Sequence, residues 1–453
     1  MFHTLACGEE LKRNRQPIIL LRTISTLTPA KRRAVITGIG PIAACGIGRD
    51  AFWRRIREGR SGITRLTAFA VEGCRAMSVG EVPDWDPTFY FPPHRLKRLD
   101  RYAQFSVASA LLALEDARLP WSKERPQART GVSFGTALGG IAGAEDEHAR
   151  FLKKGARGVN PTLALQVFGG SAHSNIAIEC GFRGVGTTNS NSCASGVVAV
   201  GEALRYIRDG WADVMLAGGA EAPLSPLTFS SFDFIKTMSR WAGEPAAEAC
   251  RPFDKARDGF VMGEGGCTLI LEELTHAVAR GAHIYAEVCG YALNNDAYHM
   301  TSPHPDGQSV TSCMLAALDD AAVPPEKIGY INCHASSTQL NDAGEVACIK
   351  RAFGDHARSL SISGTKPFTA HPLGATAAME TAICALALQE QWLPPTLHHR
   401  NPDASCDLDI VPNHGRSSSF EFAMNNAFGF GGINSSLVLR RWIAADEINP
   451  RDL

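Results

Sequence analysis

The chain has 453 residues, of which 45% are hydrophobic and 20% are charged, and its formal net charge is −1. A charge this close to zero gives no global field for binding nucleic acid or an anionic membrane surface, and no apolar run reaches the about 18 residues that a membrane span needs. The thirteen cysteines include no CxxC pair. They therefore predict neither a metal site nor a disulfide framework, and they favour the reducing cytoplasm.

The first 32 residues differ from the rest of the chain. Six lysine and arginine residues in this stretch are opposed only by Glu9 and Glu10. The apolar stretch 18–21 is too short for the core of a secretory signal. Residues 1–32 are therefore predicted to be an N-terminal extension, either a flexible tail or a transit peptide.

From residue 33 onward, strand-like and helix-like segments alternate, which predicts a layered α/β fold. One such series opens with the apolar segment 34–38, and a second series opens with the segment 285–291. We expect two similar halves that meet near residue 280. The first spans residues 33–281 and the second spans residues 282–443.

A cysteine stands where a polar segment gives way to a helical pattern. Residues 187–192 are polar where a buried strand should be apolar, so the residues alone predict a loop. Cys193 follows, and from Gly196 apolar residues recur at helical spacing until Gly210. The first N–H groups and the dipole of a helix stabilise a thiolate. Cys193 is therefore a candidate nucleophile.

Two histidines downstream each follow a probable strand. His334 ends the apolar run 330–333, and His371 comes shortly after the alternating segment 361–363. A long helical pattern over residues 375–391 follows the second histidine. Open α/β sheets bind ligands at the carboxyl ends of their strands. A cysteine and two histidines at such ends indicate a site for covalent acyl chemistry.

Two short motifs suggest other classes of protein. Residues 131–135 fit the G-x-S-x-G elbow of serine hydrolases, with Ser133 as the nucleophile. Ser133 alternates with its apolar neighbours as an ordinary strand residue does, and no strong helix follows it. Residues 38–43 fit the G-x-G-x-x-A fingerprint of dinucleotide-binding proteins. The acid expected about 20 residues on is unconvincing, because Glu58 lies in a charged helical stretch.

Nearly the whole chain, from about Arg33 to Arg441, resembles the condensing enzymes of the thiolase superfamily. The resemblance is strongest to the β-ketoacyl-acyl carrier protein synthases of type II systems. The segments that carry it, in this order and spacing, are AVITGIGPIA (34–43), DRYAQFSVASALLALEDA (100–117), NSCASG (191–196), ADVMLAGGAEAPLSP (212–226), RPFDKARDGFVMGEGG (251–266), DAYHMTSP (296–303), NCHASSTQLNDAGE (332–345), TKPFTAHPLGATAAME (365–380), PPTLHHRNPDASCDLDIVP (394–412) and NNAFGFGGINSSLVL (425–439). The resemblance implies a five-layered αβαβα thiolase fold made of two similar halves.

The same resemblance implies a decarboxylative Claisen condensation with no metal and no resident cofactor. Cys193 would take an acyl group from the phosphopantetheine of an acyl carrier protein. His334 and His371, donating through neutral imidazole N–H groups, would stabilise the enolate formed when malonyl thioester loses carbon dioxide. The backbone N–H groups of Cys193 and Phe430 would form the oxyanion hole for the acyl transfer.

The resemblance also assigns supporting roles. Lys366 and Glu380 would pair beside the histidines, and Asp342 and Glu345 would support the first of them. Phe428 and Phe430 lie in a glycine-rich loop, where Phe430 would gate the acyl pocket. The pocket residue Leu138 completes the predicted site; it follows the segment that carries the hydrolase motif.

The motifs also depart from the family pattern. The nucleophile motif is Asn-Ser-Cys, and alanine replaces glycine at Ala335 and Ala370, which restricts the backbone angle φ near both histidines. Pro367 removes one backbone donor. We expect catalysis to survive. The segments 223–239 and 339–342 favour a specialised polyketide or polyene pathway, while primary fatty-acid synthesis stays open.

The expected partners are an acyl carrier protein and a second subunit. The protein would form a homodimer, or a heterodimer with a chain-length-factor-like subunit. A non-catalytic, chain-length-factor-like role for this chain is a further alternative, and the presence of Cys193 argues against it. Candidate contacts for the acidic carrier are the basic residues Arg95, Lys97, Arg98 and Arg101.

Overall fold

The computed structural model describes residues 31–70 and 72–443. The predicted N-terminal extension lies outside these residues, apart from Lys31 and Arg32. Ten strands of the described chain run side by side in one continuous sheet, and a short strand, β2 (Gly46–Ile47), pairs with β1 beside this path. The ten strands, in spatial order, are β12 (Ser361–Ser363), β11 (Ile328–Asn332), β15 (Phe422–Gly429), β16 (Ile433–Arg441), β10 (Ala286–Asn295), β1 (Ala34–Ala43), β9 (Gly265–Glu273), β7 (Val214–Glu221), β5 (Thr130–Gly135) and β6 (Gly186–Asn189).

The pairing pattern repeats in the two halves of this sheet. In the order β1-β9-β7-β5-β6, the first two pairings are antiparallel and the last two are parallel. The order β10-β16-β15-β11-β12 has the same sequence of pairings. The halves are joined where β1 pairs with β10 over residues 34–36 and 286–288. The chain therefore consists of two similar five-stranded units, as the sequence predicted.

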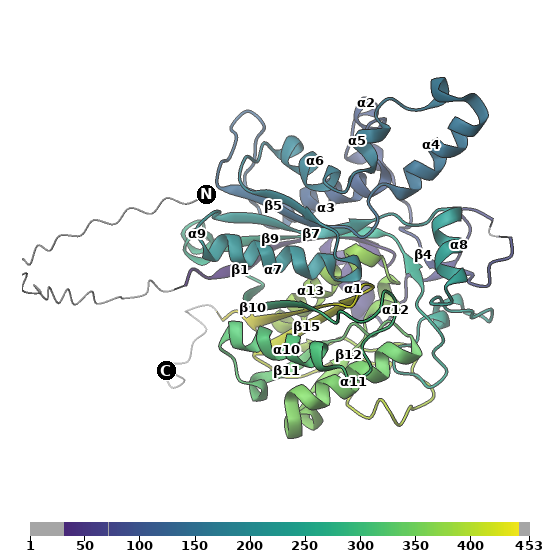
Figure 1. Cartoon of the computed structure of the whole chain (residues 1–453). Helices are drawn as coiled ribbons and strands as arrows, with labels where there is room; N and C mark the ends of the chain where they lie inside the picture. The colour runs from purple at the N-terminus through teal and green to yellow at the C-terminus, as the bar shows by residue number, and fades with distance from the viewer. Residues whose placement is uncertain (1–30, 71, 444–453) are drawn as a thin grey trace, which may run out of the picture. The chain divides into compact units, whose positions relative to one another are not determined.

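Helices cover both units and fill the space between them (Figure 1). The middle layer holds α7 (Ser195–Arg208) and α13 (Leu373–Glu390), and α13 is buried along almost its whole length. The outer face of the first unit is covered by α3 (Arg101–Asp116) and α6 (Ser171–Cys180). The outer face of the second unit is covered by α10 (Gln308–Ala321) and α11 (Gln339–Phe353). The result is the predicted five-layered αβαβα arrangement.

Apolar sequence explains why these elements form the core. All ten residues of β1 are buried, because the strand lies between β10 and β9 with helices on both faces. Strands that are buried on both faces have nearly continuous apolar sequences. The middle helices share one hydrophobic cluster with both halves of the sheet, and Val197, Leu204 and Ile383 belong to it. The predicted helix over 375–391 is confirmed as α13.

One expectation from the residues alone is wrong. The polar segment 187–192, predicted to be a loop, contains strand β6 over Gly186–Asn189. This strand lies at the edge of the sheet, where β5 is its neighbour, and its residues are half-exposed. An edge strand does not need the apolar sequence of a central one. The polar composition of this segment therefore reflects the position of β6 at the edge of the sheet and does not indicate a loop.

The boundary predicted at residues 281–282 lies in the connection between α9 (Leu274–Ala279) and β10, and the extents of the two halves stay a prediction.

The remaining short strands lie at the periphery of the two units. They are β3 (Thr64–Arg65), β4 (Ser78–Gly80), β8 (Met262–Gly263), β13 (Trp392–Leu393) and β14 (Arg416–Ser417). The other helices are α1 (Arg49–Arg57), α2 (Pro93–Leu96), α4 (Ile141–Lys154), α5 (Leu163–Val167), α8 (Pro226–Phe234) and α12 (Lys366–Thr369).

Candidate active site

The candidate nucleophile lies at the start of the central helix layer. Cys193 is in a 3-10 turn, Ser192–Ala194, that leads directly into α7. The apolar face of α7 is buried between the two halves of the sheet, which holds this turn at the carboxyl end of β6. The residue is 8% exposed. The sequence therefore located the cysteine correctly at a helix start.

The two histidines meet this cysteine from the second unit. His371 lies between α12 and α13, and its Nε2 atom is 3.2 Å from Sγ of Cys193. His334 follows β11, and its ring centre is 5.6 Å from that of His371, with the two rings nearly perpendicular. Both histidines are buried. Three residues that are distant in sequence thus share one small volume.

A buried ion pair lies behind the histidines. Nζ of Lys366 is 2.7 Å from Oε1 of Glu380, and both side chains are at most 2% exposed. The lysine also donates to the backbone carbonyl of His334, and its Nζ is 3.5 Å from Nδ1 of that ring. Lys366 therefore fixes the position of His334 through both its backbone and its side chain.

The two acids on α11 hold the backbone around His334. The Glu345 carboxylate accepts the N–H groups of His334 and Ala335, each at 2.9 Å. The Asp342 carboxylate accepts the N–H groups of Phe253 at 3.0 Å and Ser337 at 3.1 Å. These contacts are to backbone groups, which fits a supporting role for both acids.

Burial controls the charge of the site. It lowers the pKa of His334 well below 6.5, and nearby Lys366 and His371 lower it further. Burial followed by the charge of Lys366 has the same effect on the pKa of His371. Both imidazoles are therefore neutral at pH 7. A neutral imidazole carries one N–H and can donate it without acting as a strong acid.

The expectation of a thiolate favoured by the helix start needs correction. Burial raises the pKa of Cys193 to about 11, and the opposing contributions of Ser192, Lys366 and the Phe430 backbone do not offset it. Desolvation penalises the buried thiolate more than these groups stabilise it. In this structure the resting residue is a thiol.

The phenylalanine loop and the predicted pocket residue lie against the same centre. The Phe428 ring is 5.6 Å from that of His334, and the Phe430 ring stacks on Phe232 at 6.2 Å. Leu138 packs against the apolar cluster that contains Cys193. The structure therefore brings all ten predicted site residues together.

One anchoring residue of this region was not singled out from the sequence. Glu221 ends β7 and is fully buried; it accepts N–H groups from Ala137 at 2.6 Å, Leu138 at 3.1 Å and Gly374 at 3.0 Å. It thereby ties the Leu138 loop to the start of α13. The signal in the sequence is an acid at the end of an otherwise apolar strand.

Comparisons with known proteins identify the family. The profile described as "Beta-ketoacyl synthase, N-terminal domain" matches residues 31–277, and "Beta-ketoacyl synthase, C-terminal domain" matches residues 285–400. The chain belongs to the β-ketoacyl synthase family. It is 40% identical over 412 residues to a 3-oxoacyl-[acyl-carrier-protein] synthase 2 of Synechocystis sp., covering 91% of this chain and 99% of the relative. A synthase of the same name from Coxiella burnetii is 39% identical, with the same coverage.

Solved ketosynthase structures superpose on this chain over most of its length. A type II polyketide synthase ketosynthase, solved with its acyl carrier protein (AntDE:AntF), superposes with a TM-score of 0.85 at 36% identity. The ishigamide ketosynthase/chain length factor superposes with a TM-score of 0.85 at 35% identity. Each similarity covers 91% of this chain and 100% of the other.

The alanines that depart from the family pattern take strained backbone angles in this β-ketoacyl synthase. Ala335 has a φ of 37° and Ala370 a φ of 58°, in the region that favours glycine. Neighbouring glycines make room for both methyl groups. A Cβ atom on Gly364 would lie 2.6 Å from that of Ala335, and one on Gly80 would lie 2.5 Å from that of Ala370. The departures are thus accommodated by local packing.

The two alternative motifs have structural explanations. Ser133 lies within strand β5, is fully buried and has no hydrogen-bond partner among the described residues, so it is not on a nucleophile elbow. Gly38 and Gly40 lie within β1. A Cβ atom on either would come within 2.3 Å of a carbonyl oxygen of α3. These glycines therefore permit close helix–sheet packing rather than phosphate binding.

The basic residues proposed for carrier contact divide into two groups. Arg95 is paired with Glu179 at 3.3 Å, and Arg101 binds both oxygens of Glu264. Lys97 and Arg98 are exposed. Of the four basic residues, Lys97 and Arg98 are therefore the two that are available to an acidic partner.

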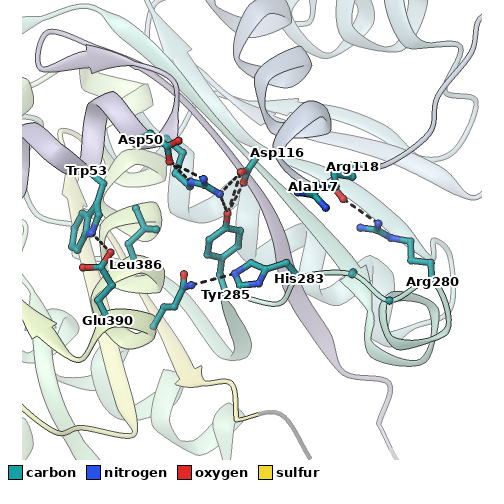
Figure 2. Close-up of a pocket in the computed structure, with 14 residues that line it drawn as sticks. Asp50, Trp53, Asp116, Ala117, Arg118, Arg280, His283, Tyr285, Leu386 and Glu390 are labelled. Carbon is teal, nitrogen blue, oxygen red and sulfur yellow. Dashed lines mark hydrogen bonds and ion pairs between the residues drawn. The ribbon is translucent and has the colours of Figure 1, made fainter.

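A cavity of about 860 Å³ lies elsewhere in the molecule and contains none of the predicted site residues (Figure 2). Three of its charged residues, Arg49, Asp50 and Asp116, are paired with one another. Arg49 is 2.5 Å from Asp116, and the Tyr285 hydroxyl donates to the same carboxylate at 2.9 Å.

In the part of the chain that the structure describes, no group of three or more His, Cys, Asp or Glu residues is arranged to hold a metal. No helix there is long and apolar enough to cross a membrane.

Proposed function

We propose that this chain is a 3-oxoacyl-[acyl-carrier-protein] synthase in which Cys193 carries the acyl group. The observation that carries the proposal is the meeting of one thiol and two neutral imidazoles in a buried site, with Nε2 of His371 3.2 Å from Sγ of Cys193. The names of the curated relatives support the carrier-bound substrate.

In the first half-reaction, the Cys193 sulfur attacks the thioester carbonyl carbon of an acyl carrier protein. A new carbon–sulfur bond forms, the bond to the phosphopantetheine sulfur breaks, and the proton of the cysteine passes to that leaving thiol. The backbone N–H of Phe430 is directed toward Sγ of Cys193, which supports its role as an oxyanion donor at this carbon.

In the second half-reaction, malonyl thioester loses carbon dioxide and leaves an enolate. His334 and His371 donate N–H groups to the enolate oxygen, and their neutral state prevents them from quenching the carbanion as strong acids. The enolate carbon then attacks the acyl carbonyl carbon. A carbon–carbon bond forms, the bond to the Cys193 sulfur breaks, and the sulfur takes up a proton from water to return to the thiol. The β-ketoacyl thioester leaves on its carrier.

The same comparisons support a proposal about the partners. One ketosynthase neighbour was solved with its acyl carrier protein, and another with a chain length factor. We propose a carrier protein and a second subunit for this chain, either a copy of itself or a related subunit. The exposed edge of β6 and the exposed apolar side chains Phe151, Leu152, Leu165, Phe168 and Ile178 support a subunit contact on this side of the first unit.

Two further expectations from the sequence stand as proposals. The reaction needs no metal or resident cofactor, because the acyl and malonyl groups arrive on phosphopantetheine. A cytoplasmic location is supported by the thiols, since every cysteine that the structure describes is free. Whether the pathway is fatty-acid or specialised polyketide synthesis depends on which acyl donor is preferred.

The test is the intact mass of the protein after incubation with acyl-carrier thioesters that differ in length and unsaturation. Acylation of the wild type and not of Cys193→Ala, followed by discharge as a β-keto product when malonyl-carrier protein is added, is the expected result. The best donor separates the two pathways. No acylation with any donor, in the presence and absence of a chain-length-factor subunit, contradicts the proposal. Sedimentation of a strictly monomeric, active protein contradicts the dimer.

A further inference from the structure

A threonine in the first turn of α13 contacts the second histidine. Oγ1 of Thr376 is 2.8 Å from Nδ1 of His371, on the side of the ring opposite to Cys193. Thr376 is 1% exposed. Among the hydrogen bonds of the described residues, this is the one in which the Thr376 hydroxyl takes part. Nothing in the sequence pattern of α13 distinguishes this threonine from its small neighbours.

The direction of this hydrogen bond determines which nitrogen of His371 carries the proton. The ring is neutral, so it has one N–H and one bare nitrogen. If Thr376 donates its hydroxyl proton to Nδ1, the ring proton lies on Nε2 and faces Cys193. If Nδ1–H donates to Thr376 instead, Nε2 is bare and accepts a proton from the cysteine.

Burial of Thr376 favours the first arrangement, in which its hydroxyl donates to Nδ1 of His371. In the second arrangement the Thr376 hydroxyl hydrogen has no acceptor within the described hydrogen bonds, although the residue is buried. Leaving a buried hydroxyl unsatisfied costs its full desolvation penalty. In the first arrangement the group left without an acceptor is the S–H of Cys193. A thiol is a weak donor, so the cost of leaving it unpaired is smaller.

We propose that Thr376 is a positioning residue that holds the proton of His371 on Nε2, and this role rests on the condensation proposed above. The Thr376 hydroxyl then fixes His371 as an N–H donor toward the reacting atoms. His371 consequently does not take the proton of Cys193 in the resting enzyme, because Nε2 already carries one. The same nitrogen is ready to donate to the enolate oxygen once malonyl thioester has lost carbon dioxide.

His334 is oriented in an analogous way by a different group. Its Nδ1 atom is 3.5 Å from Nζ of Lys366, which can donate but has no lone pair when charged. Both histidines thus have a donor behind Nδ1 and present Nε2–H to the site. The donor is a cation for one ring and a neutral hydroxyl at shorter distance for the other.

The direct test is histidine nitrogen NMR on the full-length protein labelled with ¹⁵N-histidine. The signals of His371 are assigned by their loss in His371→Gln. We expect the wild-type ring to have a hydrogen-bearing Nε2 and a bare Nδ1. In Thr376→Val, which keeps the shape and removes the hydroxyl, we expect a shift toward the other tautomer, and Thr376→Ser should restore the wild-type pattern. A wild-type ring that carries its proton on Nδ1 overturns the proposal.

Kinetics separate this role from a structural one. In Thr376→Val we expect condensation to fall by up to about 100-fold, the cost of losing one oxyanion donor, while the rate of Cys193 acylation stays within a few-fold. The matched control is Thr311→Val, because Thr311 is also buried in a helix and its hydroxyl donates to the carbonyl of Gly307, away from the candidate site. The control should lose comparable stability and keep condensation.

The outcomes are distinguishable from failure of the proposed function. Equal losses of acylation and condensation in Thr376→Val, matched by the loss in Thr311→Val, assign Thr376 a packing role and overturn the inference. A wild-type protein that is not acylated at all contradicts the proposed function. The NMR result still decides the tautomer in that case, because it requires no substrate.

Discussion

Nε2 of His371 lies 3.2 Å from Sγ of Cys193, although the two residues are 178 positions apart in the sequence. Each residue comes from a different half of the chain, and the middle helices α7 and α13 bring them together. The site therefore forms only when both halves are folded against one another. Its chemistry follows from burial, which keeps the imidazoles neutral and the cysteine protonated.

The reactivity of Cys193 should depend on pH in an unusual way. Burial raises the pKa of this thiol from 9.0 to about 11, and a raised pKa means that the thiolate appears only at higher pH. The rate of alkylation by iodoacetamide should therefore keep rising up to about pH 11. Cys193→Ala, measured in parallel by intact mass, reports the background from other cysteines. A plateau below pH 9 contradicts the prediction.

The buried pair Lys366–Glu380 should respond differently to removal of each partner. Glu380→Gln leaves an uncompensated buried cation and should lower the free energy of unfolding by about 3–5 kcal/mol. Lys366→Met should cost less at pH 6, because burial raises the pKa of Glu380 to about 7 and loss of the lysine raises it further. The carboxyl can then take up a proton. Chemical denaturation at pH 9, where the wild-type carboxyl is ionised, measures the loss in Glu380→Gln, and denaturation at pH 6 measures the loss in Lys366→Met.

The same pair makes a prediction about pH. A carboxyl with a raised folded pKa contributes most stability below its unfolded pKa, near 4.5, and loses it as the pH rises through the folded value. The wild-type carboxyl releases its proton near pH 7, whereas the carboxyl of Lys366→Met holds its proton to higher pH. The free energy of unfolding of Lys366→Met, relative to the wild type, should therefore fall as the pH rises above about 7. A difference that is constant over this range would show that Glu380 does not become protonated in the variant.

The strained alanine next to His371 should be coupled to a glycine in β4. A Cβ atom on Gly80 would lie 2.5 Å from that of Ala370, so Gly80→Ala should destabilise the protein by about 1–3 kcal/mol through overpacking. In the background of Ala370→Gly this loss should be smaller. A double-mutant cycle by denaturation should give a coupling of about 1 kcal/mol. Gly344→Ala is a control, because no atom lies within 4 Å of its added Cβ. Additive effects contradict the packing explanation.

Removing the hydroxyl of the alternative nucleophile should leave catalysis intact. Ser133 is buried in β5 with no hydrogen-bond partner among the described residues, so Ser133→Ala should keep acylation and should not lower stability. The matched control is Ser109→Ala. Its hydroxyl lies 2.8 Å from that of Thr268, and its loss should cost about 1 kcal/mol. A loss of acyl transfer in Ser133→Ala would favour the hydrolase hypothesis.

Much of the chemistry was predictable from the sequence, because it resides in short segments whose local structure is determined by nearby residues. The helix pattern after Gly196 and the apolar run before His334 put Cys193 and the first histidine at the ends of regular elements. The family resemblance then supplied the roles of Lys366 and Glu380. The apolar sequence of β1 identified it as a buried strand.

Other features depend on contacts between segments that are far apart. The edge position of β6 explains its polar sequence, and this position is set by the order of strands in the sheet. The burial of Cys193 comes from packing contributed by both halves, and for this reason its pKa is raised rather than lowered. The contact between Thr376 and His371 was visible only in the structure. By itself the sequence predicted which groups would react. Only the tertiary structure decided their protonation, because a pKa depends on desolvation and on charges that folding brings near.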